Sequence, residues 1–273
     1  MAILPRHTDR KTDRAGGSFR LTDAASPSLG IGAGSFVLLE SYEGEGAYVS
    51  ELDLALKLEP GARVQRIVLC DEPADAVSVS RCEVTLAPGA SFAQTVIVSG
   101  ARRQRVETHV RQPGGGASVR LDGVYLLADQ RHADITTVVV HEGVGGATEQ
   151  LTKGVVAGQA RGVFQGRITV QPGADKTDAR MGHHALILSE RAEVDAKPEL
   201  EIFADDVACA HGNTVGALDE DALFYAMQRG LPEQVARAML TEAFLGEVVD
   251  RIEHDGARDI VRAWVVERLR AAT

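Results

Sequence analysis

A cysteine and a histidine two positions apart are the residues of this sequence best suited to chemistry. Cys209 and His211 lie where a strand is expected, and side chains two positions apart on a strand leave from the same face. A thiolate beside an imidazole suits iron, copper or zinc. Two ligands do not complete a metal site, and the spacing alone favours a buried thiol next to a hydrogen-bonded histidine. A metal site here needs ligands from other strands or another subunit.

Two other groups of polar residues precede this pair. His183 and His184 are adjacent, and neighbours on a strand point to opposite faces, so we do not expect them to chelate one ion. Residues 175–180 mix acids and bases, as the outer sheets of β-helix carbohydrate lyases do. We favour a cross-strand salt-bridge ladder on a solvated face for this segment.

Strands must position these side chains, because apolar and polar residues alternate over much of residues 34–215. The clearest case is Leu52, Leu54, Leu56 and Leu58, whose alternation places one set of side chains on a buried face. No helical period interrupts the strands, so a doubly wound α/β sheet is not expected.

A Gly-Ala pair recurs between the strands. The pairs begin at Gly46, Gly61, Gly89, Gly116, Gly146 and Gly173. After the first step, successive pairs are 28, 27, 30 and 27 residues apart. Glycine accepts the positive φ of a corner, and corners that recur regularly among short strands are typical of a solenoid. The alternative is a β-sandwich with unrelated tight turns, which stays open on spacing alone because Gly-Ala is a common pair in a sequence rich in both residues.

The periodicity turns helical near the C-terminal end. Asp219 can cap a first helix that Gly230 ends, Pro232 suits the first turn of a second, and a third apolar stripe follows Gly256. The fold is therefore predicted to be mainly β with a C-terminal three-helix domain. The predicted parts are a loose leader, a β-solenoid core and a helical domain, over residues 1–33, 34–217 and 218–273.

Composition and charge limit the functions of the chain. The formal net charge of −10 argues against a nucleic-acid partner, because phosphate binding needs a concentrated basic surface. The three cysteines are far apart and form no C-x-x-C pair, which fits a reducing cytosol. No apolar stretch reaches the roughly 18 residues of a membrane helix, and the N-terminus does not suit a signal peptide. We expect a cytoplasmic protein with no membrane partner.

Several segments are similar in sequence to a known family. They are residues 42–46, 153–156, 160–164, 176–180, 196–207, 209–216, 218–225 and 229–230. Together they resemble the SufB/SufD family of iron–sulfur cluster assembly proteins, and they are most similar to SufD. The resemblance covers roughly residues 35–255, and residues 196–230 are its most specific part.

The resemblance implies a fold and a set of partners. The implied fold is a right-handed parallel β-helix followed by a helical C-terminal domain. A SufD-type chain pairs with SufB through its β-helix and binds the ATPase SufC through its C-terminal helices, in a SUF complex that builds iron–sulfur clusters. It has no catalytic turnover of its own and is linked to iron acquisition. We therefore expect no stably bound cofactor, only transient iron or cluster at the interface with SufB; a homodimer in isolation is left open.

The resemblance also points to single residues. His211 matches the family histidine that faces a SufB cysteine at the interface, and Cys209 matches its neighbour, so both are expected as iron or cluster ligands there. Gly212 follows the histidine, as in SufD-like chains, whereas SufB-like chains have Glu and Ala. Residues 181–184 differ from the Gln/Asn-rich sequence expected at this point in the family. The family's N-terminal helical domain has no counterpart, and we expect a shortened chain or a short natural member.

The apolar stripes of the expected C-terminal helices exceed what one short bundle needs for itself. Leu240, Phe244 and Leu245 are therefore predicted to contact SufC, as a helix face does in a hydrophobic groove. The alternative is a stripe that packs wholly within the chain.

Two rival functions remain open. A SufB-like scaffold that holds the cluster itself would need more than three cysteines, and Gly212 argues against it. A β-helix carbohydrate lyase or hydrolase would be secreted and would carry an array of acids and bases on an outer sheet.

Overall fold

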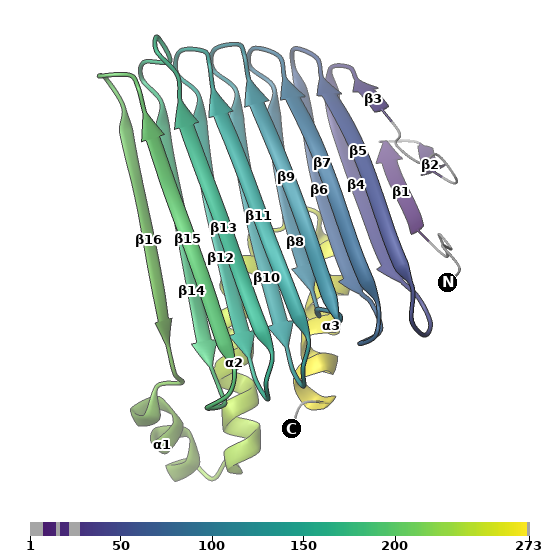
Figure 1. The fold of residues 1–273 in the computed structure, drawn as a ribbon, viewed down its shortest axis with the longest axis vertical. Coiled ribbons are helices and arrows are strands. Elements are labelled where there is room, and N and C mark those ends of the chain that lie inside the picture. The colour runs from purple at the N-terminus through teal and green to yellow at the C-terminus, as the bar shows by residue number, and fades with distance from the viewer. Residues whose placement is uncertain (1–7, 15–16, 22–27, 272–273) are drawn as a thin grey trace.

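Two long parallel sheets make up the body of the protein (Figure 1). The computed structural model describes the backbone of residues 8–14, 17–21 and 28–271 and the side chains of residues 28–269. The first sheet contains, from one edge to the other, β16 (Ala208–Gly216), β14 (Asp178–Ile187), β12 (Ala147–Val156), β10 (Ser118–Leu127), β8 (Ser91–Val98), β6 (Ala62–Asp71), β4 (Gly34–Glu43), β1 (Thr8–Arg14) and β2 (Gly17–Leu21). The second contains β15 (Glu193–Ile202), β13 (Arg161–Val170), β11 (His132–His141), β9 (Arg103–Gln112), β7 (Val77–Leu86), β5 (Val49–Leu58) and β3 (Ser28–Ile31).

The chain passes alternately from one sheet to the other, which makes the body a parallel β-solenoid. From β4 onward each strand pairs in parallel with the strand two elements later, so one coil contributes one strand to each sheet. A coil takes 27 residues between the paired positions Ser91 and Ser118, and 31 between Ala147 and Asp178. The predicted solenoid is confirmed, and the β-sandwich alternative is wrong because, from β3 onward, consecutive strands lie in different sheets and pair in parallel with strands of the next coil.

The alternation and the corners work as the sequence predicts. In β5, Leu54, Leu56 and Leu58 are at most 2% exposed and point into the space between the sheets. Glycines with positive φ turn the corner before the strands of the first sheet, as at Gly61 and Gly89. The alanine that follows each of these two glycines is buried, so the pair there combines a left-handed corner with a small core side chain. The pair at Gly146 differs, because the positive φ belongs to Gly145 and Ala147 is exposed.

The start of the chain differs from the expected loose leader. β1 pairs antiparallel with both β2 and β4, and therefore extends the first sheet at its N-terminal edge. Backbone hydrogen bonds make this pairing, so an edge hairpin can form from a polar sequence without apolar alternation. Residues 1–7, 15–16 and 22–27, also assigned to the leader, lie outside the described residues.

Three helices follow the solenoid: α1 (Glu220–Gln228), α2 (Glu233–Val249) and α3 (Asp255–Ala271). The Asp219 carboxylate accepts hydrogen bonds from the first-turn amides of α1, as a capping residue does, and Gly230 has φ +91° just past the end of that helix. None of the helices within the described residues has the length and apolar character needed to cross a membrane.

Helices α2 and α3 pack on the outer face of the first sheet and do not form a separate bundle (Figure 1). Leu245, Val261 and Val265, each at most 2% exposed, share one apolar cluster with Ile67 and Val124 of the sheet. At least part of the apolar stripe that the sequence analysis assigned to a partner is therefore covered by the chain's own sheet.

Polar contacts fix the helices to this sheet. The Arg251 guanidinium donates to Asp122 and Glu149 at 2.9 Å each. The Trp264 indole N–H donates to Asp71 at 3.1 Å, which ties α3 to the end of β6.

Candidate functional site

The last coil of the solenoid exposes positions that are buried in the coil before it. Within the described residues, β16 has no strand on its free edge. Its residues Cys209, His211, Asn213 and Val215 pair in register with Ala179, Met181, His183 and Ala185. These four positions of β14 are at most 3% exposed, whereas Val215 is 45% exposed and His211 is also exposed. The core face of the solenoid is thus open to solvent at this end.

Large apolar side chains surround the open coil. Ile202 at the end of β15, Phe203 in the turn that follows, and Val215 of β16 are 42%, 60% and 45% exposed. We call these three residues the open-end patch. Phe224 and Tyr225 of α1, which follows β16 closely in the chain, are 63% and 60% exposed (Figure 1). Exposed apolar residues grouped in this way are typical of interaction surfaces.

Cys209 and His211 lie on this open face. Cys209 is half-buried against the adjacent core residues, and His211 is exposed. Burial raises the pKa of the Cys209 thiol; a hydrogen bond with the Ala179 backbone opposes this, and the charge of Asp178 adds to it. The thiol is therefore protonated at neutral pH, and a metal would have to displace the proton.

These two side chains do not form a metal site by themselves. Among the described residues, no three His, Cys, Asp or Glu side chains are grouped so that they could hold a metal ion. Cys70 and Cys82 are buried elsewhere in the solenoid and are free thiols, as is Cys209. Whether Cys209 and His211 bind iron or cluster stays a prediction.

His183 lies inside the solenoid, one coil before the end. Its Nε2 lies 2.9 Å from the Tyr125 hydroxyl and its Nδ1 lies 2.7 Å from the Asn213 Oδ1 of β16. Its ring stacks on Phe164 with the ring centroids 4.8 Å apart. The arrangement fits a neutral imidazole that accepts from the tyrosine and donates to the asparagine. Burial lowers the pKa of His183 to about 4, partly opposed by the hydrogen bond with Asn213, which agrees with a neutral ring.

The polar residues near His183 point outward. The Nδ1 of His184 lies 2.7 Å from the Thr214 hydroxyl, on the opposite face from His183, as alternation requires. Arg180 pairs with Asp178 at 3.1 Å, and both side chains are more than half exposed. This pair lies along a single strand, so the expected cross-strand ladder is replaced here by a contact between positions two apart.

The interior residues around His183 were not found from the sequence, because they come from different coils. Tyr125, Phe164 and Asn213 are separated from one another by at least 39 residues. Two glycines in the sequence could have indicated that a large side chain lies close by. A Cβ added at Gly154 or Gly162 would overlap the Tyr125 ring. A glycine inside an alternating strand marks such a close approach.

The three tail residues predicted to contact SufC have different environments. Leu245 is fully buried against the sheet, and Leu240 is half-buried. Phe244 is half-buried beneath the Lys153 ammonium, which lies 4.3 Å from its ring centroid. Leu245 is thus not accessible to a partner while α2 lies on the sheet.

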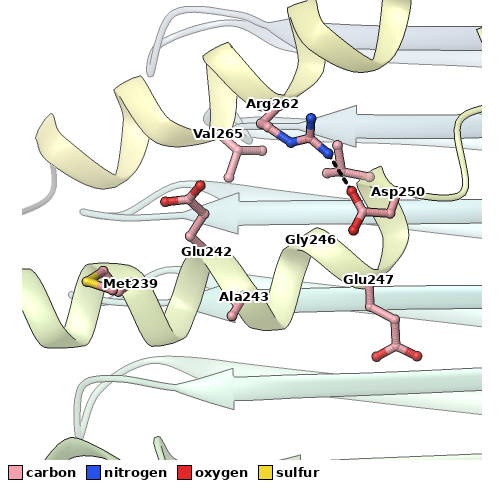
Figure 2. Close-up of a pocket in the computed structure, with 9 residues that line it drawn as sticks. Met239, Glu242, Ala243, Gly246, Glu247, Asp250, Arg262 and Val265 are labelled. Atoms are coloured by element: carbon pink, nitrogen blue, oxygen red, sulfur yellow. Dashed lines mark hydrogen bonds and ion pairs between the residues drawn. The ribbon is translucent and has the colours of Figure 1, made fainter. Parts of the chain in front are cut away.

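A groove on the outward side of the helices is accessible. It lies between α2 and α3 and has a volume of about 580 Å³ (Figure 2). Met239, Glu242 and Ala243 of α2 line it, with Arg262 of α3 across from them, and Met239 is 52% exposed. Arg262 is held by an ion pair with Asp250, the dashed contact in Figure 2.

Comparison with known proteins gives related chains. Residues 32–244 match the family model described as the SufBD core domain of SUF system FeS cluster assembly. The iron-sulfur cluster assembly protein SufD of Escherichia coli (strain K12) is 32% identical over 215 residues, which cover 78% of this chain and 51% of that protein. The iron-sulfur cluster assembly SufBD family protein ML0594 of Mycobacterium leprae (strain TN) is 28% identical over 244 residues, which cover 86% of this chain and 62% of that protein.

The fold and the open coil define a parallel β-solenoid protein with helices on one face. The family match covers most of that solenoid and extends into α2. The chain belongs to the SufBD family of iron–sulfur cluster assembly proteins. It spans about half the length of the SufD protein of Escherichia coli.

Proposed function

We propose that this chain is a non-catalytic, SufD-type subunit of a cytoplasmic SUF complex. It pairs with a SufB-type subunit through the open coil of its solenoid and binds the ATPase SufC through its helices. Iron or a nascent cluster is the cargo of this assembly and passes transiently at the subunit interface.

The observation that carries the proposal is the open core face of β16. Positions that are at most 3% exposed in β14 are followed, one coil later, by exposed positions in the same register. A second solenoid that docks on this end would bury the open-end patch. A strand of the partner could also pair with the backbone groups on the free edge of β16. An interface of this kind brings the partner's side chains next to Cys209 and His211.

The ligand chemistry suits a shared site more than a site within one chain. A half-buried thiol and an exposed imidazole stand on one face, and a metal ion needs further ligands. A SufB-type partner would supply them. This also argues against the SufB-like scaffold, since the other two cysteines are buried and no metal-binding group of three occurs among the described residues.

The helices offer a separate surface for SufC. The groove between α2 and α3 faces outward, away from the sheet, and carries the exposed Met239. Of its acidic members, Glu247 and Asp250 are already paired with Lys153 and Arg262, so Glu242 is the one best suited to a basic group of a partner. This groove is a better candidate than the residues first predicted, because Leu245 is covered and Phe244 is partly covered.

The proposal is tested by changing His211 in the assembled complex. Wild-type and His211→Ala chains are each co-expressed with SufB and SufC from the same cell. We expect equal subunit recovery but lower iron content and lower cluster absorbance in the variant, because one cargo ligand is lost. Cys209→Ala should have a milder effect, because its thiol is protonated and half-buried.

His184→Ala is the matched control, since it removes an imidazole from the neighbouring strand on the opposite face. Equal iron and equal cluster transfer in wild type and His211→Ala would show that the histidine only packs at the interface. Failure of SufB to co-purify with the wild-type chain would contradict the pairing itself.

A further inference from the structure

A second cavity lies between the helices and the corner turns at the C-terminal ends of the strands of the first sheet. It has a volume of about 720 Å³, within the range of roughly 300–1,000 Å³ that is typical of small-molecule sites. The turns after β10, β12 and β14 form one side of it, and the first half of α2 and the end of α3 form the other. It is therefore distinct from the outward groove in Figure 2.

The lining combines an apolar surface with arginines. Leu126, Val155 and Leu269 provide apolar surface from both the sheet and α3. The cavity is also lined by three arginines, Arg131 of the turn after β10, Arg237 of α2 and Arg268 of α3, and by a single acidic residue, Asp129. This is a cationic site in a chain whose formal net charge is −10.

The three arginines differ in how they are held. Arg268 is paired with Asp71. Arg237 forms an ion pair with Glu233 at 2.8 Å in which both side chains are about half exposed, and such a pair contributes little and can be exchanged for a ligand.

Arg131 is held without an acid. Its Nη1 donates to the backbone carbonyls of Glu72 and Gly100, at 2.8 and 2.7 Å. No carboxylate within the described part of the chain forms an ion pair with it. Two carbonyl oxygens orient the guanidinium but leave its charge uncompensated, and its other N–H groups can still donate. A fixed, planar guanidinium of this kind suits a carboxylate or a phosphate group.

We propose that this cavity binds a small amphipathic anion, with its apolar body against Leu126, Val155 and Leu269 and its carboxylate or phosphate on Arg131. The ligand would bridge the solenoid turns and the helices, because both line the cavity. Its occupancy would therefore hold α2 and α3 on the sheet.

The test uses four probes on the whole chain, measured by titration calorimetry below their micelle concentrations. Octanoate and octyl phosphate carry the two kinds of anionic head, octyl glucoside has the same tail without charge, and inorganic phosphate has a head without a tail. We expect one saturable site for the two amphipathic anions and at least tenfold weaker binding of the other two probes. The tighter of the two anions identifies the head group.

Two variants separate the site from general surface binding. Arg131→Gln should weaken both anions at least fivefold and leave octyl glucoside unchanged. Because this change also removes contacts to two turns, Ala238→Trp provides an independent test: it fills the cavity from α2, keeps Arg131, and should weaken every octyl probe. Arg111→Gln, an exposed arginine outside the cavity, is the control and should bind as wild type does.

Equal binding of octyl glucoside and octanoate to the wild type would overturn the proposal, because it would indicate an apolar surface with no anion site. Unchanged anion binding in either Arg131→Gln or Ala238→Trp would also overturn it.

Discussion

His183 is neutral because its surroundings leave no room for a charged ring. It is fully buried, stacks on Phe164 and uses one ring nitrogen as an acceptor for the Tyr125 hydroxyl. A second proton would remove that acceptor and place an uncompensated charge inside the solenoid. His141 is likewise fully buried, with its Nε2 2.9 Å from the Thr148 hydroxyl, and burial lowers its pKa to about 4.

The two buried histidines predict a loss of stability in mild acid. A histidine pKa of about 4 in the folded state lies below the unfolded value of 6.5, so the unfolded chain binds protons first. Each contribution is complete above pH 6.5 and is lost as the pH falls toward 4, by about 3 kcal/mol per histidine. Asp122 acts in the opposite direction, since burial raises its pKa to about 6, but it is one group against two.

Urea unfolding between pH 7.5 and 4.5 measures this dependence. His183→Gln keeps a donor and an acceptor for Asn213 and Tyr125, so it should reduce the acid-induced drop by up to half. His211→Gln, on an exposed histidine at the open end of the solenoid, should leave the drop unchanged. An equally large drop in His183→Gln and wild type would contradict the assignment of this effect to His183.

Gly154 provides a second prediction at the scale of single residues. A Cβ at this position would overlap the Tyr125 ring, which is fully buried and cannot move away. Gly154→Ala should therefore lower the free energy of unfolding by about 1–3 kcal/mol, as overpacking does. The matched change Gly182→Ala, in the adjacent strand β14, meets its nearest atoms at an ordinary 3.5 Å and should be nearly neutral. Thermal melts of both variants measure the change in stability. Similar losses of stability in the two variants would show that the Tyr125 contact is not the cause.

At the scale of elements, one buried carboxylate of the sheet helps to hold the helices against it. Asp122 is 3% exposed and receives the Arg251 guanidinium from the segment between α2 and α3. Arg251→Ala would leave Asp122 buried with only Arg120 as a cationic partner, 3.4 Å away, which should cost about 2 kcal/mol at pH 7.5. The loss should shrink near pH 5, where the carboxylate of Asp122 is largely protonated.

Hydrogen exchange of the α2 and α3 amides, together with urea unfolding, measures the effect of Arg251→Ala. Arg262→Ala is the control, because Arg262 and Asp250 form an exposed pair on the same helices and should contribute less than about 1 kcal/mol. Equal losses from the two substitutions would rule out a special role for the buried carboxylate.

On the scale of the whole molecule, the two candidate partner surfaces lie on different parts of the chain. The open-end patch belongs to the last coil, and the groove between α2 and α3 lies on the helices (Figures 1 and 2). A SufB-type subunit and SufC could then bind at the same time, and a substitution in one surface should leave the other intact.

The groove prediction is tested with SufC alone. Met239→Asp combined with Ala243→Asp should reduce SufC capture at least tenfold at an unchanged circular-dichroism spectrum, because two charges replace apolar groove residues. Val235→Asp makes the same kind of change at a 45% exposed position of α2 outside the groove and should leave capture unchanged. If SufC binds the double variant as it binds the wild type, the groove is not the docking surface.

Local patterns in the sequence favoured a solenoid over a sandwich and predicted most of its corners and the change from strands to helices. Alternation along a strand, a glycine at a positive φ and an aspartate at a helix start each depend on a few neighbouring residues, so they can be read without coordinates. The same rule of alternation placed Cys209 and His211 on one face and His183 and His184 on opposite faces.

Contacts between distant parts of the chain decided the rest. Leu245 and Val124 share a cluster although 121 residues separate them, so only the folded chain shows that α2 lies on the sheet. His183 of β14 and Tyr125 of β10 are 58 residues apart and meet because Gly154 of β12, the strand between them, leaves room for the tyrosine ring. The exposure of His211 also depends on stacking: its position is like that of Met181, but no further coil covers it within the described residues. Local side-chain patterns cannot encode which coil is the last, because each coil repeats the same alternation.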